Sequence, residues 1–203
     1  MMQRRDLLKM IMATTGMAMV GSDAFGYEMK SQVPITDTIF KSDDLLLFNE
    51  IADIILPRTN TPGAKDVNAG LMALILANDC YTLRERAVLV KGLQSLNEEV
   101  EKNYGSPYIL LSSKQKFEFI NQLDVAAKEY NHQQNIYYLS STPYDRESSD
   151  DKPLPHYFTL IKQLTLFSFF TSQQAATKVL RYEAVPGKYN GELPYKKGDR
   201  AWF

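Results

Sequence analysis

The spacing of the apolar residues constrains this chain more than any other feature of its sequence. Apolar side chains recur every three or four positions over most of the stretch between residues 42 and 180. One such series is Leu83, Ala87, Val90, Leu93, Leu96 and Val100. This spacing places side chains on one face of an α-helix, whereas a half-buried strand needs strict alternation. We therefore predict an all-α fold, a single helical domain of about five to six helices.

Polar residues mark three of the expected helix starts. Ser42 precedes two acidic residues, which favour the positive end of a helix dipole. Thr82 with Glu85, and Ser112 with Gln115, form capping boxes that satisfy free N–H groups of a first turn. Together with the apolar spacing, these signals predict helices over about residues 42–56, 67–80, 82–100, 112–130, 157–170 and, more briefly, up to 180.

Other stretches lack this periodicity. Residues 27–41 are predicted to be a linker, and Ser141–Pro153 a long exposed loop, since it is polar and rich in Ser, Asp and Pro. Asn60–Gly63 has the composition of a turn. After Pro186 and Gly187 nothing is periodic, so an irregular C-terminal arm is expected at the end of a helical domain that spans residues 42–203.

The N-terminus has the composition of an export signal. Its basic start contains Arg4, Arg5, Leu7, Leu8 and Lys9. The uncharged run Met10–Val20 that follows is shorter than the ~20 residues that cross a bilayer as a helix. Paired arginines ahead of a mildly apolar run resemble a twin-arginine signal, which we assign to residues 1–26. An ordinary secretory signal and an uncleaved amphipathic start are the alternatives.

The sequence lacks the residues that common redox and nucleotide sites need. It has no glycine-rich dinucleotide motif, no phosphate-binding loop and no haem attachment motif. The lone Cys80 cannot form an internal disulfide or hold an iron–sulfur cluster, and we expect it to be a buried structural thiol. A formal net charge of -1 gives no indication of a nucleic-acid partner. We therefore expect no catalytic residue, no cofactor and no metal ligand in this chain.

Acidic pairs are candidates for acid–base chemistry. They are Asp43 with Asp44, Glu98 with Glu99, and Asp150 with Asp151. Their settings are a helix start, a polar helix face and a polar loop, which favour solvated charges. The alternative is a stand-alone exported hydrolase that uses one of these carboxylate pairs.

Two blocks of sequence carry a resemblance to a known family. The first runs from Glu50 to Pro57 and continues as Asn60-Thr61-Pro62-Gly63-Ala64-Lys65. The second contains Arg181-Tyr182-Glu183 and then Val185-Pro186-Gly187-Lys188-Tyr189. In this order the blocks resemble the gluconate 2-dehydrogenase subunit 3 family.

The resemblance implies a non-catalytic small subunit of a periplasmic dehydrogenase complex. The large subunit of such a complex is a flavoprotein of the glucose–methanol–choline type, which oxidises a sugar or sugar acid with FAD. Its electrons pass to a cytochrome c subunit or to a quinone. The small subunit stabilises the large one and carries the signal that the twin-arginine translocase reads. Co-export of a folded partner would also explain such a signal on a chain without a cofactor, and a cofactor-free protein that folds quickly is the other explanation.

The C-terminal arm is the predicted partner interface. Its aromatic residues cannot all be buried by an irregular segment, and aromatic side chains are enriched at the centres of interfaces. The Pro-Gly turns of the two family-like blocks are predicted to contribute as well. The predicted interface residues are Pro62, Gly63, Pro186, Gly187, Tyr189, Tyr195, Trp202 and Phe203.

Overall fold

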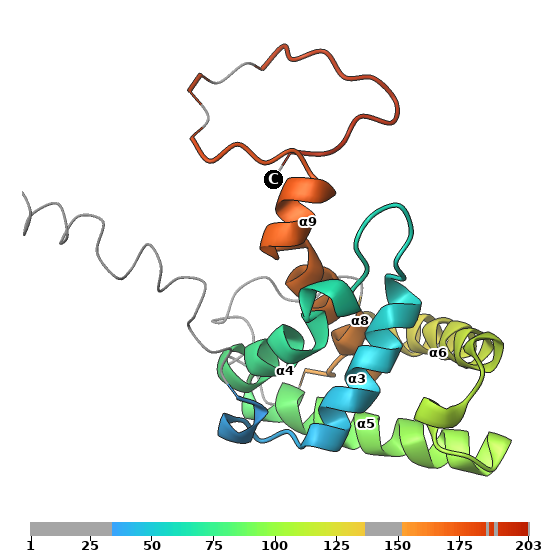
Figure 1. The fold of residues 1–203 in the computed structure, drawn as a ribbon. Helices are drawn as coiled ribbons and strands as arrows, with labels where there is room; N and C mark the ends of the chain where they lie inside the picture. Colours follow the sequence, from blue (N-terminus) through green and yellow to red (C-terminus); the bar gives the residue numbers. More distant parts are fainter. Residues whose placement is uncertain (1–33, 137–151, 186, 189–190, 203) are drawn as a thin grey trace, which may run out of the picture. The chain divides into compact units, whose positions relative to one another are not determined.

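The described part of the protein is built from α-helices. A computed structural model describes residues 34–136, 152–185, 187–188 and 191–202. The predicted signal, most of the predicted loop 141–153, and Pro186, Tyr189 and Phe203 lie outside these residues. The described α-helices, shown in Figure 1, are α3 (Ser42–Ile55), α4 (Ala69–Cys80), α5 (Leu83–Tyr104), α6 (Ser113–Gln133), α8 (Tyr157–Phe170) and α9 (Gln173–Lys178). Within the described residues no strand is present, so the predicted all-α class is confirmed.

The predicted capping boxes are present at two helix starts. The Thr82 hydroxyl accepts the Glu85 N–H at 3.3 Å, and a Glu85 carboxylate oxygen accepts the Thr82 N–H at 2.9 Å. Ser112 and Gln115 make the same reciprocal pair before α6. These bonds satisfy N–H groups that have no partner within the helix, and so they fix where each helix begins.

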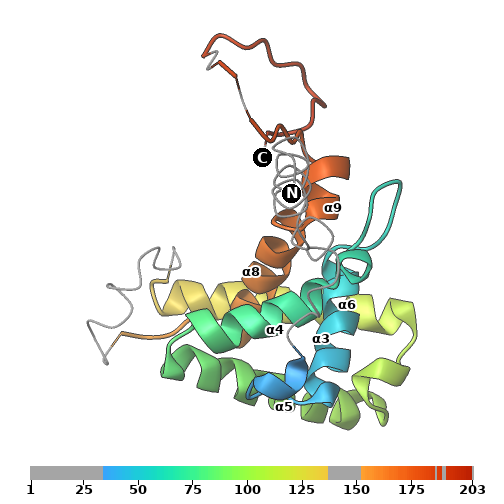
Figure 2. The same ribbon diagram turned by 60° about the vertical axis from the view of Figure 1, so that its left-hand side comes forward.

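Helix α8 lies at the centre of the domain and contacts α3, α4, α5, α6 and α9, as the two views in Figures 1 and 2 show. Its fully buried side chains include Leu160, Ile161 and Thr165. The hydroxyl of Thr165 donates to the Ile161 carbonyl of its own helix at 2.8 Å, so this polar group is satisfied inside the core. His156 caps the start of α8, because its Nδ1 accepts the Phe158 N–H at 3.2 Å.

Helices α5 and α8 approach closely at Gly92. A Cβ atom at this position would lie 2.2 Å from Cγ of Tyr157, which is far inside van der Waals contact. Only glycine therefore allows the ring of Tyr157 to lie against the backbone of α5.

The buried face of α5 includes Leu93, Leu96 and Val100, as predicted, but differs from the prediction in the first half of the helix. Leu89 and Gly92 are buried, whereas Leu83 and Ala87 of the predicted series are exposed. The series was derived from apolarity, but burial follows the side on which α8 packs. A glycine carries no apolar side chain to mark that side.

Two further sequence expectations need correction. Cys80 is exposed at the end of α4, so the prediction of a buried thiol is wrong. The cause is its place at the last residue of the helix, beyond the packed face. Phe40, within the predicted linker, is only 3% exposed and belongs to the core, which therefore begins before Ser42. None of the helices described here has the length and apolarity needed to span a membrane.

Candidate functional site

The loop that follows α3 contains the first Pro-Gly turn and closes on itself. The Ala64 N–H donates to the Leu56 carbonyl at 2.9 Å. A Cβ atom on Gly63 would lie 2.5 Å from the backbone nitrogen of Arg58, so the two sides of the loop meet here only because residue 63 is glycine. Gly63 is buried, and its own role is to close the loop; the residues that the loop exposes are those from Pro57 to Thr61.

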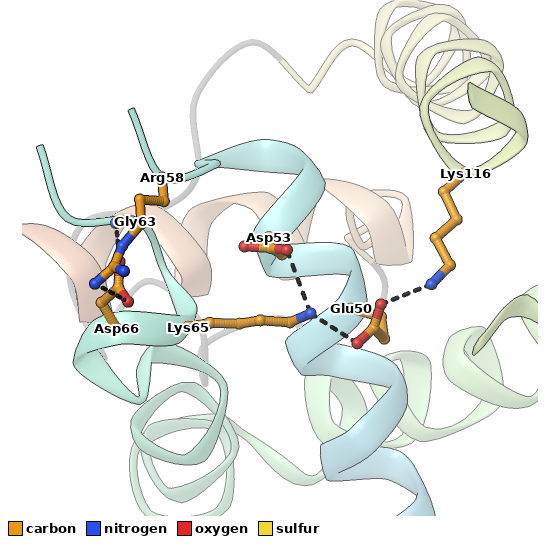
Figure 3. A network of polar contacts seen from close by, with 7 residues as sticks. All are labelled: Glu50, Asp53, Arg58, Gly63, Lys65, Asp66 and Lys116. Atoms are coloured by element: carbon orange, nitrogen blue, oxygen red, sulfur yellow. Dashed lines mark hydrogen bonds and ion pairs between the residues drawn. The ribbon is translucent and has the colours of Figure 1, made fainter. Parts of the chain in front are cut away.

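Asp66 ties the base of this loop to Arg58. Its carboxylate accepts the Gly63 N–H at 2.8 Å and binds the guanidinium of Arg58 through Nε and Nη2, each at 2.8 Å. The Gly63 N–H, followed by the Arg58 guanidinium, holds the pKa of Asp66 below its usual value. The contacts are drawn in Figure 3. Arg58 itself remains 73% exposed, so the loop presents a positive charge to solvent.

A second set of charges joins the loop to the helical core. Glu50 of α3 lies between Lys65, at 2.7 Å, and Lys116 of α6, at 2.7 Å (Figure 3). Lys65 also binds Asp53 at 3.2 Å. The side chain of Lys116 is only 11% exposed, and its ammonium lies 5.7 Å from the centre of the buried Tyr108 ring. Glu50 therefore connects α3, α6 and the segment after the loop.

The surroundings of Glu50 favour its ionised form. Burial alone would raise the pKa of Glu50, but the hydrogen bonds from Lys116 and Lys65 outweigh burial and leave the pKa below its usual value. Asp124 is held in the same way by Lys128 and Lys162, at 2.6 and 2.7 Å. A general acid needs a raised pKa, so these carboxylates are suited to structural ion pairs rather than to proton donation.

The predicted acidic pairs show no arrangement for catalysis in the described residues. Asp44 accepts the Lys41 N–H at 2.8 Å and so stabilises the start of α3. Glu98 and Glu99 are exposed on α5, and Asp150 with Asp151 lies outside the described residues. A search of the residues that the structure describes finds no group of three His, Cys, Asp or Glu side chains able to hold a metal ion.

The first Pro-Gly loop and the C-terminal segment meet at one end of the domain. The side-chain amide of Gln174, in α9, donates to the Asp66 carbonyl at 3.3 Å. In both Figure 1 and Figure 2 the loop after α3 lies beside the end of α8 and the start of α9. Asp66, directly after the first family-like block, and Gln174, 108 residues later in α9, are thus brought together at this end.

The C-terminal arm, defined here as residues 181–202, returns to its own starting point. The Arg181 N–H donates to the Ala201 carbonyl at 2.8 Å, and the guanidinium of Arg181 lies 3.4 Å from Asp199 and 5.5 Å from the centre of the Trp202 ring. Arg200 donates to the Lys178 carbonyl of α9 at 3.0 Å. In Figure 1 the arm accordingly leaves the end of α9 as a wide loop and comes back to it.

The arm leaves its large apolar side chains in solvent. The exposed fractions are 52% for Tyr182, 80% for Val185, 47% for Leu193, 76% for Tyr195 and 54% for Trp202. Of the predicted interface residues, Gly187, Tyr195 and Trp202 are described and exposed, Pro62 is half-buried and Gly63 is buried. The exposed residues of the predicted interface therefore lie on the arm. The Pro-Gly turn at Pro62 instead fixes the shape of the loop after α3.

Sequence reasoning missed the charged residues that shape this end of the domain. Arg181 stands in one of the family-like blocks, so a signal for it was present, but its partner Asp199 has no motif of its own. Arg58 and Asp66 flank the Pro-Gly turn and could have been paired by their proximity in sequence. Nothing in the sequence around Lys116 indicates that it binds Glu50, because 66 residues separate the two.

Comparison with known proteins gives one family match. The model of a family described as gluconate 2-dehydrogenase subunit 3 matches residues 42–187, which is more than half of the chain. The matched region runs from the start of α3 into the C-terminal arm. The search of curated proteins and the search of solved structures returned no match.

Proposed function

Because the chain belongs to the gluconate 2-dehydrogenase subunit 3 family, we propose that it is the non-catalytic small subunit of a periplasmic sugar or sugar-acid dehydrogenase. In this proposal the large subunit is an FAD-dependent flavoprotein of the glucose–methanol–choline type. The small subunit binds the flavoprotein and stabilises its folded state.

The observation that carries the proposal is the family match over α3 to the arm, and the surface of the arm supports it. Tyr195 is 76% exposed and Trp202 is 54% exposed, on a segment that the match enters. Burial of one large apolar side chain stabilises an assembly by roughly 1.5–3 kcal/mol. Several such side chains on one short segment therefore favour association with another protein.

Export of the complex is the second part of the proposed function. Arg4 and Arg5, followed by Leu7, Leu8 and Lys9, form the signal for the twin-arginine translocase. That route carries folded proteins, so a flavoprotein that has already bound FAD can be exported together with the small subunit.

The proposed complex divides the chemistry between its subunits. FAD in the large subunit takes two electrons from the sugar, and the electrons then pass to a cytochrome c subunit or to a quinone. The small subunit supplies the binding surface and the export signal, and no step of the oxidation is assigned to its residues.

Co-purification from the native host tests the proposal. A tagged copy of this chain should bring down a flavoprotein with FAD absorbance and sugar-dependent reduction of a dye acceptor. In a matched strain, Arg4→Lys with Arg5→Lys should leave both proteins in the cytoplasm. A tagged chain that purifies without a flavoprotein, or a flavoprotein exported normally in the double-lysine strain, would contradict the respective part of the proposal.

A further inference from the structure

We propose that the C-terminal arm is a preformed, positively charged docking loop that binds an acidic surface on the catalytic flavoprotein subunit. This inference rests on the proposed function, because it names the surface through which the small subunit holds its partner. It is carried by the closed shape of the arm, by its charge and by its place beside the loop after α3.

The two ends of the arm are held together before any partner binds. Arg181 holds the two ends together through Ala201, Asp199 and Trp202, as described above. Near its end the arm makes a turn of its own, in which the Lys196 N–H donates to the Asp199 carboxylate at 3.0 Å and the Asp199 N–H to the Lys196 carbonyl at 2.9 Å. A loop that is already ordered loses less conformational entropy on binding than a free tail does.

The charge of the arm differs in sign from that of the helices. The arm, residues 181–202, contains five basic and three acidic residues, a formal charge of +2. Residues 34–180 contain fourteen basic and eighteen acidic residues, a formal charge of -4. Positive charge is therefore concentrated at one end of an otherwise acidic domain, which steers that end toward an acidic partner surface.

The loop after α3 extends the same surface. Arg58 is 73% exposed and lies on the loop whose base is joined to α9 by the bond from Gln174 to the Asp66 carbonyl. Asp66 binds Arg58 through two of its nitrogens, so the Arg58 guanidinium has a fixed position and its charge is partly balanced by that carboxylate.

A protein surface fits the arm better than an anionic membrane does. Glu183, Glu192 and Asp199 interrupt the basic residues of the arm, and they would be repelled by anionic head groups. A closed loop with a defined turn also offers shape complementarity, which a fluid bilayer does not need. A complementary protein surface can instead place a basic residue of its own opposite an exposed acid such as Glu183.

The test measures the Kd of the complex, formed from the full-length chain and the flavoprotein that co-purifies with it, at low and high NaCl. Lys196→Glu with Lys197→Glu reverses two exposed charges of the arm. Lys91→Glu with Lys102→Glu makes the same change on exposed positions of α5 and serves as the matched control. The arm variant should bind at least ~10-fold more weakly and with a smaller salt dependence, while the control binds as the wild type does. Circular dichroism should show unchanged helix content in both variants.

A second pair of variants tests the closed shape. Arg181→Gln removes the contacts with Asp199 and Trp202 while the backbone bond to Ala201 remains possible, and it should weaken binding by roughly 5-fold. Lys114→Gln, at a side chain that is 86% exposed on α6, removes one positive charge elsewhere and should have no effect.

The outcomes separate this inference from the proposed function. If the wild-type chain holds its flavoprotein and both arm variants bind equally well, the inference is wrong and the proposed function stands. If the wild-type chain holds no flavoprotein, the proposed function fails. Binding of the wild type, but not of the Lys196/Lys197 variant, to phosphatidylglycerol vesicles with unchanged flavoprotein affinity would assign the arm to a membrane. Salt-sensitive self-association of the wild type in place of flavoprotein binding would assign it to a second copy, and either result overturns the inference.

Discussion

The helical domain and the C-terminal arm use similar side chains in opposite ways. In the helices, Phe48 and Phe158 are at most 1% exposed and pack against neighbours from the same chain. In the arm, Tyr195 and Trp202 remain more than half exposed, although the arm is closed by its own hydrogen bonds. The comparison shows that order and burial are separate properties: polar contacts hold the arm in shape, while its apolar side chains remain available to another protein.

Charged residues show the same contrast. Glu50 and Lys116 form an ion pair that is largely buried and joins α3 to α6. Arg181 and Asp199 form a more exposed pair that joins two ends of one loop. The first pair stabilises the packing of helices, and the second sets the shape of a surface.

Removal of a core side chain should produce the largest change. Phe48→Ala is expected to lower the free energy of unfolding by about 3–5 kcal/mol, because it leaves a cavity among α3 and its neighbours. Leu46→Ala, at a side chain of the same helix that is 55% exposed, should change it by less than about 1 kcal/mol. Urea unfolding followed by circular dichroism measures both, and equal effects would show that Phe48 does not belong to the core.

Truncation after Tyr182 should separate folding from binding. Because every buried side chain among the described residues precedes this point, helix content and the free energy of unfolding should change little. Association with the flavoprotein should weaken by roughly 100-fold or more, which corresponds to about 2.7 kcal/mol. Circular dichroism and a pull-down on the same preparation give the two readings. Loss of helix on truncation would show that the arm belongs to the core of the domain, and unchanged pull-down would place the interface elsewhere.

Replacing a glycine by alanine should lower the free energy of unfolding more in the helical domain than in the arm. Gly92→Ala forces the Tyr157 ring away from α5, and we expect a loss of about 1–3 kcal/mol in the free energy of unfolding. Gly187→Ala in the arm meets no atom within 4 Å, so its effect should stay within about 1 kcal/mol. Thermal unfolding of both variants measures the difference, and similar melting temperatures would contradict the close approach of α5 and α8.

Acid should weaken the helical domain through Glu50. The folded pKa of Glu50 lies below its unfolded value of 4.5, so the stabilisation is present above pH 4.5 and is lost as the pH falls through the folded pKa. Glu50→Gln should remove this part of the acid dependence, at a cost of about 1–3 kcal/mol at neutral pH, because the largely buried Lys116 ammonium loses its carboxylate partner. Unfolding free energies at neutral and acidic pH provide the measurement. A variant that loses stability in acid as steeply as the wild type would exclude Glu50 as the titrating group.

Local sequence was sufficient to locate the helices but not the faces by which they pack. Thr82 with Glu85 and Ser112 with Gln115 begin α5 and α6 as predicted, because a capping box involves residues only three positions apart. The prediction of the buried face of α5 was wrong in part, since Leu83 is 77% exposed while Gly92 is buried. A count of apolar residues cannot detect a helix that packs through a glycine.

The sequence by itself determined the class of fold, the starts of α5 and α6, and the absence of helical periodicity in the arm. Each of these depends on backbone and side-chain contacts within a few residues. Only the tertiary structure decided that Glu50 binds Lys116, that Gln174 binds the carbonyl of Asp66, and that Arg181 closes the arm against Ala201. Those contacts join residues 20 to 108 positions apart, too far along the chain for a local sequence pattern to predict them. The first two depend on how the helical domain packs, and the third on how the arm folds back on itself.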